Sequence, residues 1–357
     1  MKKNVRFAVG TYTEPILFGT GEVFQGKGEG LYLCEFDGEK INTLCCVPLV
    51  NPSFLCIDEA RRRIYAVGEA KETLGQFGGS VSEVSYDEAL SCRVERTLLT
   101  GGTDPCHVAL SPDGQAVAVA NFASGALSVF PLDAQGCMTG ERQLFQHAGS
   151  SVHPKRQTGP HAHSGIFVDD LLFVPDLGLD QVVAYRYEGG RATAAEEFSV
   201  KTAPGSGPRY GEFSPDGEHF YLINEIASTV SHYRWDGKTM TLRDTVSTLP
   251  ADFTGENICA DLHLTPDGRF LYASNRGHDS LAVFAVEEGG ALRLLAFAPS
   301  GGRTPRQFQI DPSGRLLFVG NQDSDTIRVY AIGEDGMLTH VTTAPFPSPV
   351  CIRFFHG

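Results

Sequence analysis

Hydrophobic and polar positions along this chain form short segments separated by turn residues. Runs of four to eight residues rich in Val, Ile, Leu, Phe and Tyr recur between sequences containing Gly, Pro, Asp and Asn. Examples are "AVAVANF", "LLFVPDL", "HFYLINE", "FLYASNR" and "LLFVGNQ". Such runs are typical of β-strands, and no apolar stripe with a 3.6-residue period reaches the length of a helix. The pattern predicts a nearly all-β protein.

The strands belong to a repeat of about 50 residues. One strand of each unit ends at an anchor position: Gly68, Asn121, Asp176, Asn224, Asn275 and Asn321. A turn of the type "SPDG", "TPDG" or "DPSG" precedes four of these anchors. Sixteen residues before each anchor stands Pro52, Pro105, Pro160, Pro208, Cys259 or Pro305. Each unit therefore reads as a leading proline, strand A, a turn, strand B and two further strands.

Four-stranded antiparallel units of this length, repeated radially, are the blades of a β-propeller. Six complete units fill residues 52 to about 346, and the two ends of the chain supply a seventh. "RFAVGTY", "GLYLCEF" and "TLCCVPLV" resemble strands B, C and D, and "PSPVCIRFF" resembles a lone strand A. We therefore expect a single seven-bladed propeller domain over residues 1–357, closed by a blade that both termini share.

Charged residues interrupt the repeat at two positions that packing does not require to be charged. These positions follow the leading proline and the anchor, and both are expected at the same mouth of the central channel, because strands A and B are antiparallel. The candidate catalytic residues selected in this way are His161, Arg209, Glu225 and Arg276. An imidazole, a carboxylate and two guanidiniums could form an acid/base and anion-binding set. The alternative is a group of ion pairs that closes a water-filled channel.

Longer motifs resemble one family of propellers. "GPHAH", "GPRYGEFSPDG", "LINE", "ADLHLTPDGRFLYASNRG" and "PRQFQIDPSGRLLFVGNQ" resemble the lactonase family, which contains propeller-type 6-phosphogluconolactonases and 3-carboxymuconate cyclases. The resemblance extends from "VGTYT" to "CIRFF". Carried over by motif, it implies His161, Arg209, Glu225 and Arg276 as the catalytic set, the same four that break the repeat.

The resemblance implies hydrolysis of a sugar lactone, with 6-phosphogluconolactone as the expected substrate. Glu225 or His161 could activate water, and Arg209 and Arg276 could bind the oxyanion or the anionic group of the substrate. Further candidates for substrate binding are His163, Arg306, His107, Lys155 and Arg156. A carboxymuconate-type cyclase and a non-catalytic binding propeller are the alternatives.

The H-x-H pair of "GPHAH" could also be read as a metal clamp. A metal site needs a third ligand, and the neighbouring blade offers Arg209, whose charge disfavours a cation. We expect His161 to be catalytic, His163 to support it, and neither metal nor cofactor to take part. The glycine-rich "GTGEVFQGKGEG" does not fit a nucleotide fingerprint and is expected to be a loop over the mouth.

Composition excludes some partners. With 29 Lys and Arg against 43 Asp and Glu, the net charge of −14 argues against nucleic acid or an anionic membrane as a partner. No apolar stretch is long enough to span a bilayer, and "MKKNVRFAVGTYTEP" lacks the apolar core of a signal peptide. The nine scattered cysteines suggest reduced thiols. We expect a cytoplasmic monomer or weak homodimer.

Overall fold

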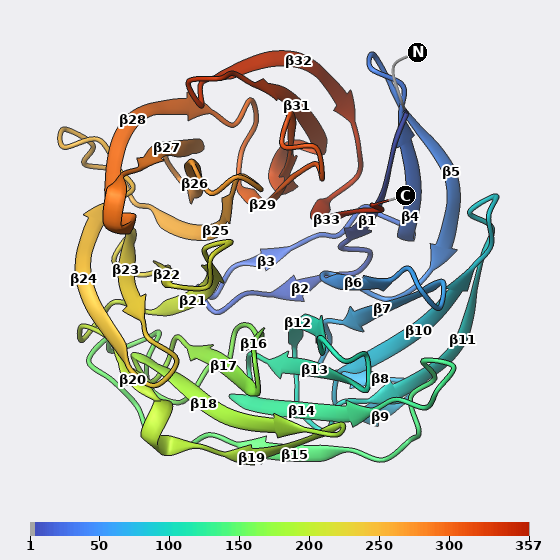
Figure 1. Cartoon of the computed structure of the whole chain (residues 1–357). Coiled ribbons are helices and arrows are strands. Elements are labelled where there is room, and N and C mark those ends of the chain that lie inside the picture. The colour runs from blue at the N-terminus through green and yellow to red at the C-terminus, as the bar shows by residue number, and fades with distance from the viewer. Residues whose placement is uncertain (1–3, 357) are drawn as a thin grey trace.

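The structure is a computed structural model that describes residues 4–356. Seven four-stranded antiparallel units surround a central channel, so the predicted seven-bladed propeller is confirmed (Figure 1). Lys2 and Lys3, which belong to the N-terminal segment considered above, lie outside the described residues. Within residues 4–356 the helical structure consists of three 3₁₀ turns: η1 (Glu196–Phe198), η2 (Glu288–Gly290) and η3 (Gln322–Ser324).

The strands follow the same order in every blade, from the channel outward. The innermost strands are β6 (Leu55–Asp58), β12 (Pro105–Leu110), β16 (Ile166–Val168), β21 (Pro208–Phe213), β25 (Ile258–Leu264), β29 (Pro305–Ile310) and β33 (Pro349–Phe354). The second strands are β7 (Arg63–Gly68), β13 (Ala116–Asn121), β17 (Leu171–Asp176), β22 (His219–Asn224), β26 (Phe270–Arg276), β30 (Leu316–Asn321) and β1 (Val5–Thr11). The third strands are β10 (Ser80–Tyr86), β14 (Ala126–Pro131), β18 (Gln181–Glu188), β23 (Thr229–Trp235), β27 (Ser280–Val286), β31 (Thr326–Ile332) and β4 (Gly30–Phe36). The outermost strands are β11 (Cys92–Leu99), β15 (Gln143–Gln146), β19 (Arg191–Ala194), β24 (Met240–Ser247), β28 (Leu292–Pro299), β32 (Leu338–Pro345) and β5 (Ile41–Pro48).

Three small elements lie outside this scheme. Strand β20 (Val200–Lys201) pairs with β18 beside β19. Two short ribbons are inserted between second and third strands: β2 (Ile16–Leu17) with β3 (Val23–Phe24), and β8 (Glu72–Thr73) with β9 (Gln76–Phe77).

Both termini build the closing blade, as the sequence predicted. Strand β33 pairs with β1 from Phe354↔Phe7 to Pro349↔Thr11, and β1 continues to β4 and β5. The aromatic rings of Phe7, Phe354 and Phe318 of the preceding blade pack together with centroids 5.0–5.8 Å apart. Closure therefore pairs the free edge of β1 and also fills the core between the first and last blades.

The strand register explains why the repeat has its period. The leading residue pairs with the anchor in β12 (Pro105↔Asn121), β21 (Pro208↔Asn224) and β29 (Pro305↔Asn321). The residue after each of these prolines has no partner, because the register shifts by one there. Each of these three strands thus opens with a β-bulge, and a bulge re-aims the side chain of its extra residue. Cys106, Arg209 and Arg306 are those extra residues.

One local prediction was wrong. His161 was expected to begin an inner strand in the register of Arg209, but β16 begins only at Ile166. A single bridge, between Ala162 and Asp176, continues the pairing towards the mouth. His161 therefore lies on an irregular segment, whose support is described below.

Among residues 4–356, no helix is long and apolar enough to cross a membrane.

Candidate active site

A cavity of about 1120 Å³ opens at the end of the channel where the inner strands begin. Its wall includes eight residues that directly follow a leading proline or an anchor: Glu69, Cys106, Phe122, His161, Glu225, Arg276, Arg306 and Gln322. The prediction that the start of strand A and the end of strand B meet at one mouth is therefore confirmed for these residues. Arg209 lies just below them and lines a small void of about 20 Å³ beneath the cavity.

Glu225 is the centre of a buried ionic cluster. It follows the last residue of β22 and is 3% exposed. Arg209 donates Nε to its Oε2 at 2.9 Å, and Arg276 Nη2 lies 2.8 Å from the same oxygen. Arg156, from the loop before β16, donates to the other carboxylate oxygen. Three guanidiniums therefore surround one carboxylate.

The pKa values in this cluster reflect an excess of positive charge. Burial alone would raise the pKa of Glu225, but Arg276, Arg156 and Arg209 outweigh it and hold that pKa well below its usual range. Burial, together with the charges of Arg209, Arg306 and Arg156, lowers the pKa of Arg276 to about 10 against the attraction of Glu225. Glu225 is therefore a fixed anion rather than a group that exchanges protons near neutral pH.

His161 presents its imidazole on the cavity wall. Its Nδ1 lies 3.0 Å from the carbonyl oxygen of Phe122, and its ring stacks on the Phe122 ring at 4.6 Å. A carbonyl oxygen only accepts hydrogen bonds, so Nδ1 carries the proton and the neutral ring has its lone pair on Nε2. The Phe122 contact thus selects the tautomer that a proton acceptor at Nε2 requires.

A buried carboxylate supplements strand pairing beneath His161, whose carbonyl oxygen accepts the Leu177 N–H at 3.0 Å. Asp176 Oδ1 accepts the backbone N–H of His161 at 2.7 Å and two N–H groups of the turn that follows β17. Its Oδ2 lies 2.6 Å from Nδ1 of His147, whose Nε2 contacts the Tyr185 hydroxyl at 2.7 Å. Glycine at 178 lets the two segments approach, since a Cβ there would lie 1.9 Å from the carbonyl oxygen of Gly159.

His163 is buried behind the cluster. Its Nε2 lies 3.9 Å from Glu225 Oε2, and its Nδ1 lies 3.5 Å from the sulfur of Cys106. Burial, and then the charge of Arg209, lowers the pKa of His163 well below its usual value. The ring is therefore neutral at physiological pH. Burial also raises the pKa of the Cys106 thiol, which makes it a poor nucleophile.

Arg306 places a further positive charge on the cavity wall, apart from the Glu225 cluster. Its Nη2 lies 3.9 Å from Glu69 Oε1, beyond hydrogen-bonding distance, and Glu69 instead accepts the Tyr12 hydroxyl at 2.9 Å. The Arg306 guanidinium carbon lies 5.3 Å from the Tyr12 ring centre and 5.0 Å from that of Phe18. Arg306 is therefore held mainly by aromatic faces.

Two of the sequence candidates for substrate binding lie away from the cavity wall. Lys155 is exposed on its loop, while the adjacent Arg156 points to Glu225. His107 lines the small void below the cavity, where burial and the charge of Arg353 lower its pKa to about 3.

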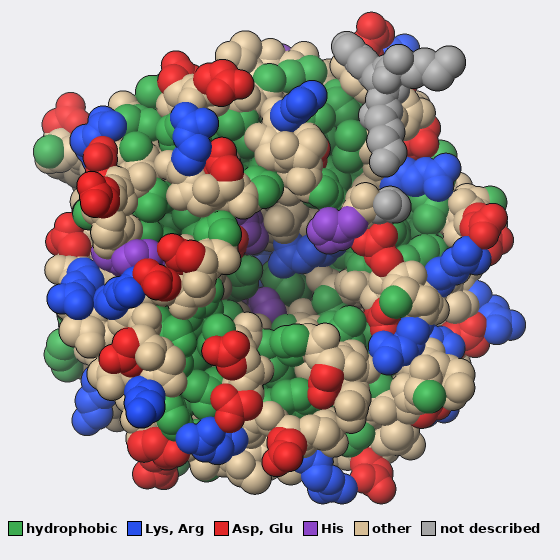
Figure 2. Space-filling model, viewed as in Figure 1, with side chains coloured by type: hydrophobic (Ala, Val, Ile, Leu, Met, Phe, Trp, Pro, Cys, Tyr) green, Lys and Arg blue, Asp and Glu red, His purple; other side chains and the backbone are tan. Residues whose placement is uncertain are grey.

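The channel continues below the void through a second charged group. His263 places Nε2 3.1 Å from Asp261 and Nδ1 2.9 Å from Glu212, so both nitrogens donate and the ring is an imidazolium. Burial alone would lower the pKa of His263, but Asp261 and Glu212 raise it to about 9. Figure 2 shows that the face opposite the cavity is also hollowed at its centre, with His and Lys or Arg side chains inside.

We expect the stability of the protein to fall between pH 6.5 and 9 because of His263. His263 has a pKa near 6.5 in the unfolded chain and about 9 in the folded protein. The stabilisation that its positive charge gives the folded state is therefore complete below pH 6.5 and is lost as pH rises through about 9. The loss is about 3 kcal/mol. Urea unfolding at both pH values should show a smaller decrease for His263→Gln than for the wild type. Equal decreases in the two proteins would contradict the assignment.

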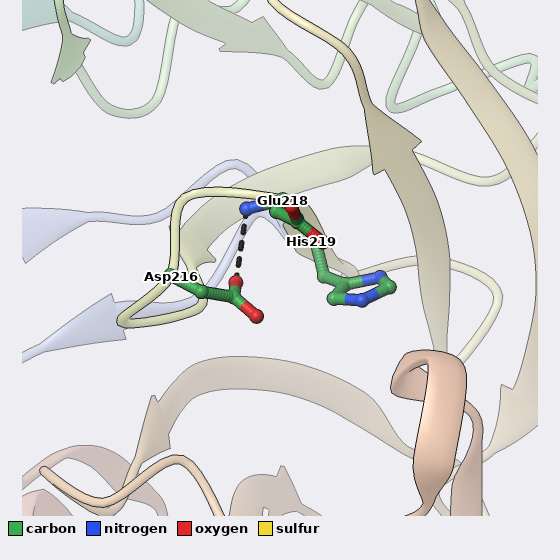
Figure 3. A group of neighbouring side chains, drawn as sticks. All are labelled: Asp216, Glu218 and His219. Atoms are coloured by element: carbon green, nitrogen blue, oxygen red, sulfur yellow. Dashed lines mark hydrogen bonds between the residues drawn. The ribbon is translucent and has the colours of Figure 1, made fainter.

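One group of acidic and histidine side chains within residues 4–356 has the proximity of metal ligands. Asp216, Glu218 and His219 lie in and beside the turn between β21 and β22, at the end of the blade away from the cavity (Figure 3). Asp216 Oδ1 accepts the Glu218 N–H at 3.0 Å and the Ser214 hydroxyl at 2.5 Å. These bonds are those of an ordinary Asx turn. The expectation that the reaction needs no metal stays a prediction.

The chain is similar to known proteins over nearly its whole length. The family model described as "Lactonase, 7-bladed beta-propeller" matches residues 6–354. The chain belongs to this family. A 6-phosphogluconolactonase of Bacillus subtilis is 31% identical over 98% of this chain and 97% of its own length. A 6-phosphogluconolactonase of Formosa agariphila is 32% identical over 80% of this chain and 79% of its own length.

A solved structure supports the same relationship. The structure of a periplasmic gluconolactonase from Pseudomonas aeruginosa superimposes with a TM-score of 0.90 at 33% identity, covering 99% of both chains. The family identification made from sequence motifs is therefore confirmed. The cytoplasmic location stays a prediction, because a similar protein is named periplasmic.

The sequence analysis did not identify several side chains around this lactonase-family site as functional residues. Glu69 and Phe122 occupied the position after the anchor but were not proposed as part of the site. Asp176 replaces the asparagine of four other blades, a signal that could have identified the support of His161. Tyr12 and Phe18 carry no repeat signal, because they belong to the insertion between β1 and β4.

Proposed function

We propose that the protein hydrolyses an anionic sugar lactone, with 6-phosphogluconolactone as substrate, in the cavity at the mouth of the channel. The observation that carries the proposal is the charge of the inner wall. Around Glu225 the guanidiniums of Arg156, Arg209 and Arg276 are three cations to one carboxylate. Arg306 adds a fourth cation beside Glu69. Buried cations in excess favour an anionic ligand. The other carboxylates that line the cavity stand outside this cluster: Glu22 and Glu256 are exposed, Asp104 lies 3.9 Å from Lys71, and Asp323 accepts the Thr304 hydroxyl.

His161 is the base that we assign to water activation. Its Nε2 accepts a proton from water as the oxygen attacks the lactone carbonyl. The ring oxygen then leaves as an alkoxide and takes that proton from the imidazolium, which returns His161 to its neutral form. The product is an open-chain hydroxy acid. Glu225 suits the role of base less well, because its low pKa opposes proton uptake near neutral pH.

Arg276 is the group that we assign to the developing oxyanion. It lines the cavity, and its Nε has no hydrogen-bond partner among the described residues. Glu225 and the carbonyl oxygen of Cys259, at 2.6 Å from Nη2, fix the guanidinium in place. A cation held before the reaction begins stabilises the oxyanion without reorganising during it.

The direct test is turnover of three compounds measured against their uncatalysed rates. We expect rapid hydrolysis of 6-phosphogluconolactone, slower hydrolysis of glucono-δ-lactone, and no reaction with carboxymuconate. No acceleration with either lactone would overturn the proposal. Turnover of carboxymuconate would favour the cyclase, and binding of the lactone without turnover would favour a binding propeller. Native mass and fractionation would test the predicted monomer or weak homodimer and cytoplasmic location.

Asp176 acts on this reaction as a positioning residue. We expect Asp176→Asn to lower kcat about tenfold with KM within about twofold, because a neutral acceptor holds the His161 backbone more weakly. Steady-state kinetics on the lactone measure both constants. Asp311→Asn is the control, since Asp311 is a buried carboxylate that accepts backbone N–H groups of the turn before β30, away from the cavity. Unchanged kcat in Asp176→Asn, or an equal loss in both variants, would contradict the role.

A further inference from the structure

The β2–β3 ribbon lies across the mouth of the channel without joining a blade. It is inserted between β1 and β4, and in Figure 1 its two strands run across the central opening, behind the blades. Residues 17–20 and 22–24 line the cavity. The ribbon is therefore one wall of the proposed substrate site, and it comes from outside the seven-fold repeat.

The base of the ribbon is tied to the propeller, whereas its tip is held only by packing. At the base, Gly28 donates its N–H to the Tyr12 carbonyl oxygen at 2.8 Å, and the Lys27 N–H bonds to the Ser348 hydroxyl at 3.0 Å. Within the described chain, residues 15–24 make no hydrogen bond or ion pair to a blade. Ile16 is buried against Tyr12 and Val350, with Phe18 and Phe24 packed beside it, so apolar packing holds the ribbon over the cavity.

The tip touches the aromatic ring on which the proposed base stacks. A Cβ on Gly19 would lie 3.1 Å from Cε1 of Phe122 and 3.5 Å from Nε of Arg156. Phe122 in turn stacks on His161. One side of the ribbon thus contacts the ring that supports His161.

Phe18, the residue directly after β2, covers Arg306. The ring of Phe18 lies 5.0 Å from the Arg306 guanidinium carbon, and it packs on Tyr12 at 5.7 Å. Arg306 donates no hydrogen bond to a described residue, and its nearest carboxylate oxygen is 3.9 Å away on Glu69. Its donors are therefore available to a ligand, while aromatic faces set the plane of the guanidinium.

The cavity is larger than a sugar lactone needs. Its volume of about 1120 Å³ exceeds the range of roughly 300–1,000 Å³ that holds drug-sized ligands. Leu17 and Val23 remain 49% and 58% exposed on the ribbon. A lactone bound beneath the ribbon would cover part of these cavity-lining side chains.

We propose that the β2–β3 ribbon is the specificity element for the anionic end of the substrate, with Phe18 as a positioning residue that acts through Arg306. Arg306 takes the phosphate monoester of the lactone, and Phe18 holds its guanidinium in the plane that presents two donors to that phosphate. The ribbon covers the substrate while His161 accepts the proton of the attacking water. This inference rests on the proposed lactone hydrolysis.

The test compares kcat/KM for 6-phosphogluconolactone and for glucono-δ-lactone, whose ratio is the phosphate preference. We expect Phe18→Ala to lower this preference about tenfold, mainly through KM, and Phe18→Tyr to retain it. Arg306→Met should remove most of the preference. Phe18→Ala added to Arg306→Met should change the ratio by less than about twofold, because Phe18 acts through Arg306.

Leu74→Ala is the matched control. Leu74 is an exposed apolar residue between β8 and β9, the other inserted ribbon, and it does not line the cavity. An unchanged preference in Phe18→Ala, an equal slowing of both lactones, or additive effects in the double variant would overturn the inference. Failure of the wild type to hydrolyse either lactone would instead overturn the proposed function.

Discussion

Replacing His161 by asparagine is expected to lower kcat for lactone hydrolysis by about 100- to 10,000-fold, the usual contribution of a general base. The amide nitrogen of asparagine occupies the place of Nδ1, so the hydrogen bond to the Phe122 carbonyl oxygen survives. The lone pair at Nε2 is lost. The variant therefore removes the proposed proton acceptor while keeping the local hydrogen bond that fixes the segment.

Three measurements make the His161 result specific. Circular dichroism and urea unfolding should match the wild type closely, because the His161 imidazole lies on a cavity wall rather than in a core. Added imidazole should restore part of the rate, since the cavity has room for it. His340→Asn, at an exposed histidine of β32, should leave kcat unchanged. A His161→Asn enzyme within about fivefold of wild-type kcat would remove His161 from the role of base.

Glu225→Gln is expected to abolish activity and also to destabilise the fold by about 3–5 kcal/mol, the usual cost of removing one partner from a buried ion pair. The substitution preserves shape but leaves the guanidiniums of Arg156, Arg209 and Arg276 without their shared carboxylate. The pKa of Glu225 is depressed in the folded state, so its stabilisation is present above the unfolded pKa and is lost as pH falls through the folded value. The difference between variant and wild type should therefore shrink in strong acid.

Urea unfolding with and without inorganic phosphate distinguishes this mechanism from a simple packing defect. Phosphate should stabilise Glu225→Gln more than the wild type, because the anion neutralises the guanidiniums that have lost their carboxylate. Glu256→Gln is the control, since Glu256 is an exposed carboxylate on the cavity rim. Wild-type stability in Glu225→Gln would show that the arginines do not depend on this carboxylate.

The periodic part of the fold could be predicted because the period is itself a structural constraint. The sixteen residues between a leading proline and its anchor asparagine reappear as the pair Pro208↔Asn224 at the mouth of the blade. The same register predicted that Glu225 and Arg276, each next to an anchor, would reach the channel mouth. The repeat therefore predicted the positions of these site residues as well as the order of the strands.

Residues outside the repeat could not be placed in this way. Arg156 lies on a loop, where sequence spacing does not predict the direction of a side chain. Only the fold brings it to Glu225. His161 was assigned to an inner strand because the repeat has one there, but Asp176 accepts its backbone N–H in place of ladder pairing. The ribbon that carries Phe18 was expected only as a loop over the mouth, since its contacts with Arg306 depend on tertiary packing.

The bulge that opens the inner strands has a consequence for how this propeller can diversify. The extra residue takes no part in the ladder, so exchanging its side chain leaves the pairing of strands A and B unchanged. The chain already varies this position, with Cys106, Arg209, Arg306 and Val350 occupying it in four blades. Substitutions during evolution can therefore change the side chains around the channel one blade at a time, because the residues that contact the ligand are separate from those that pair the strands and close the ring.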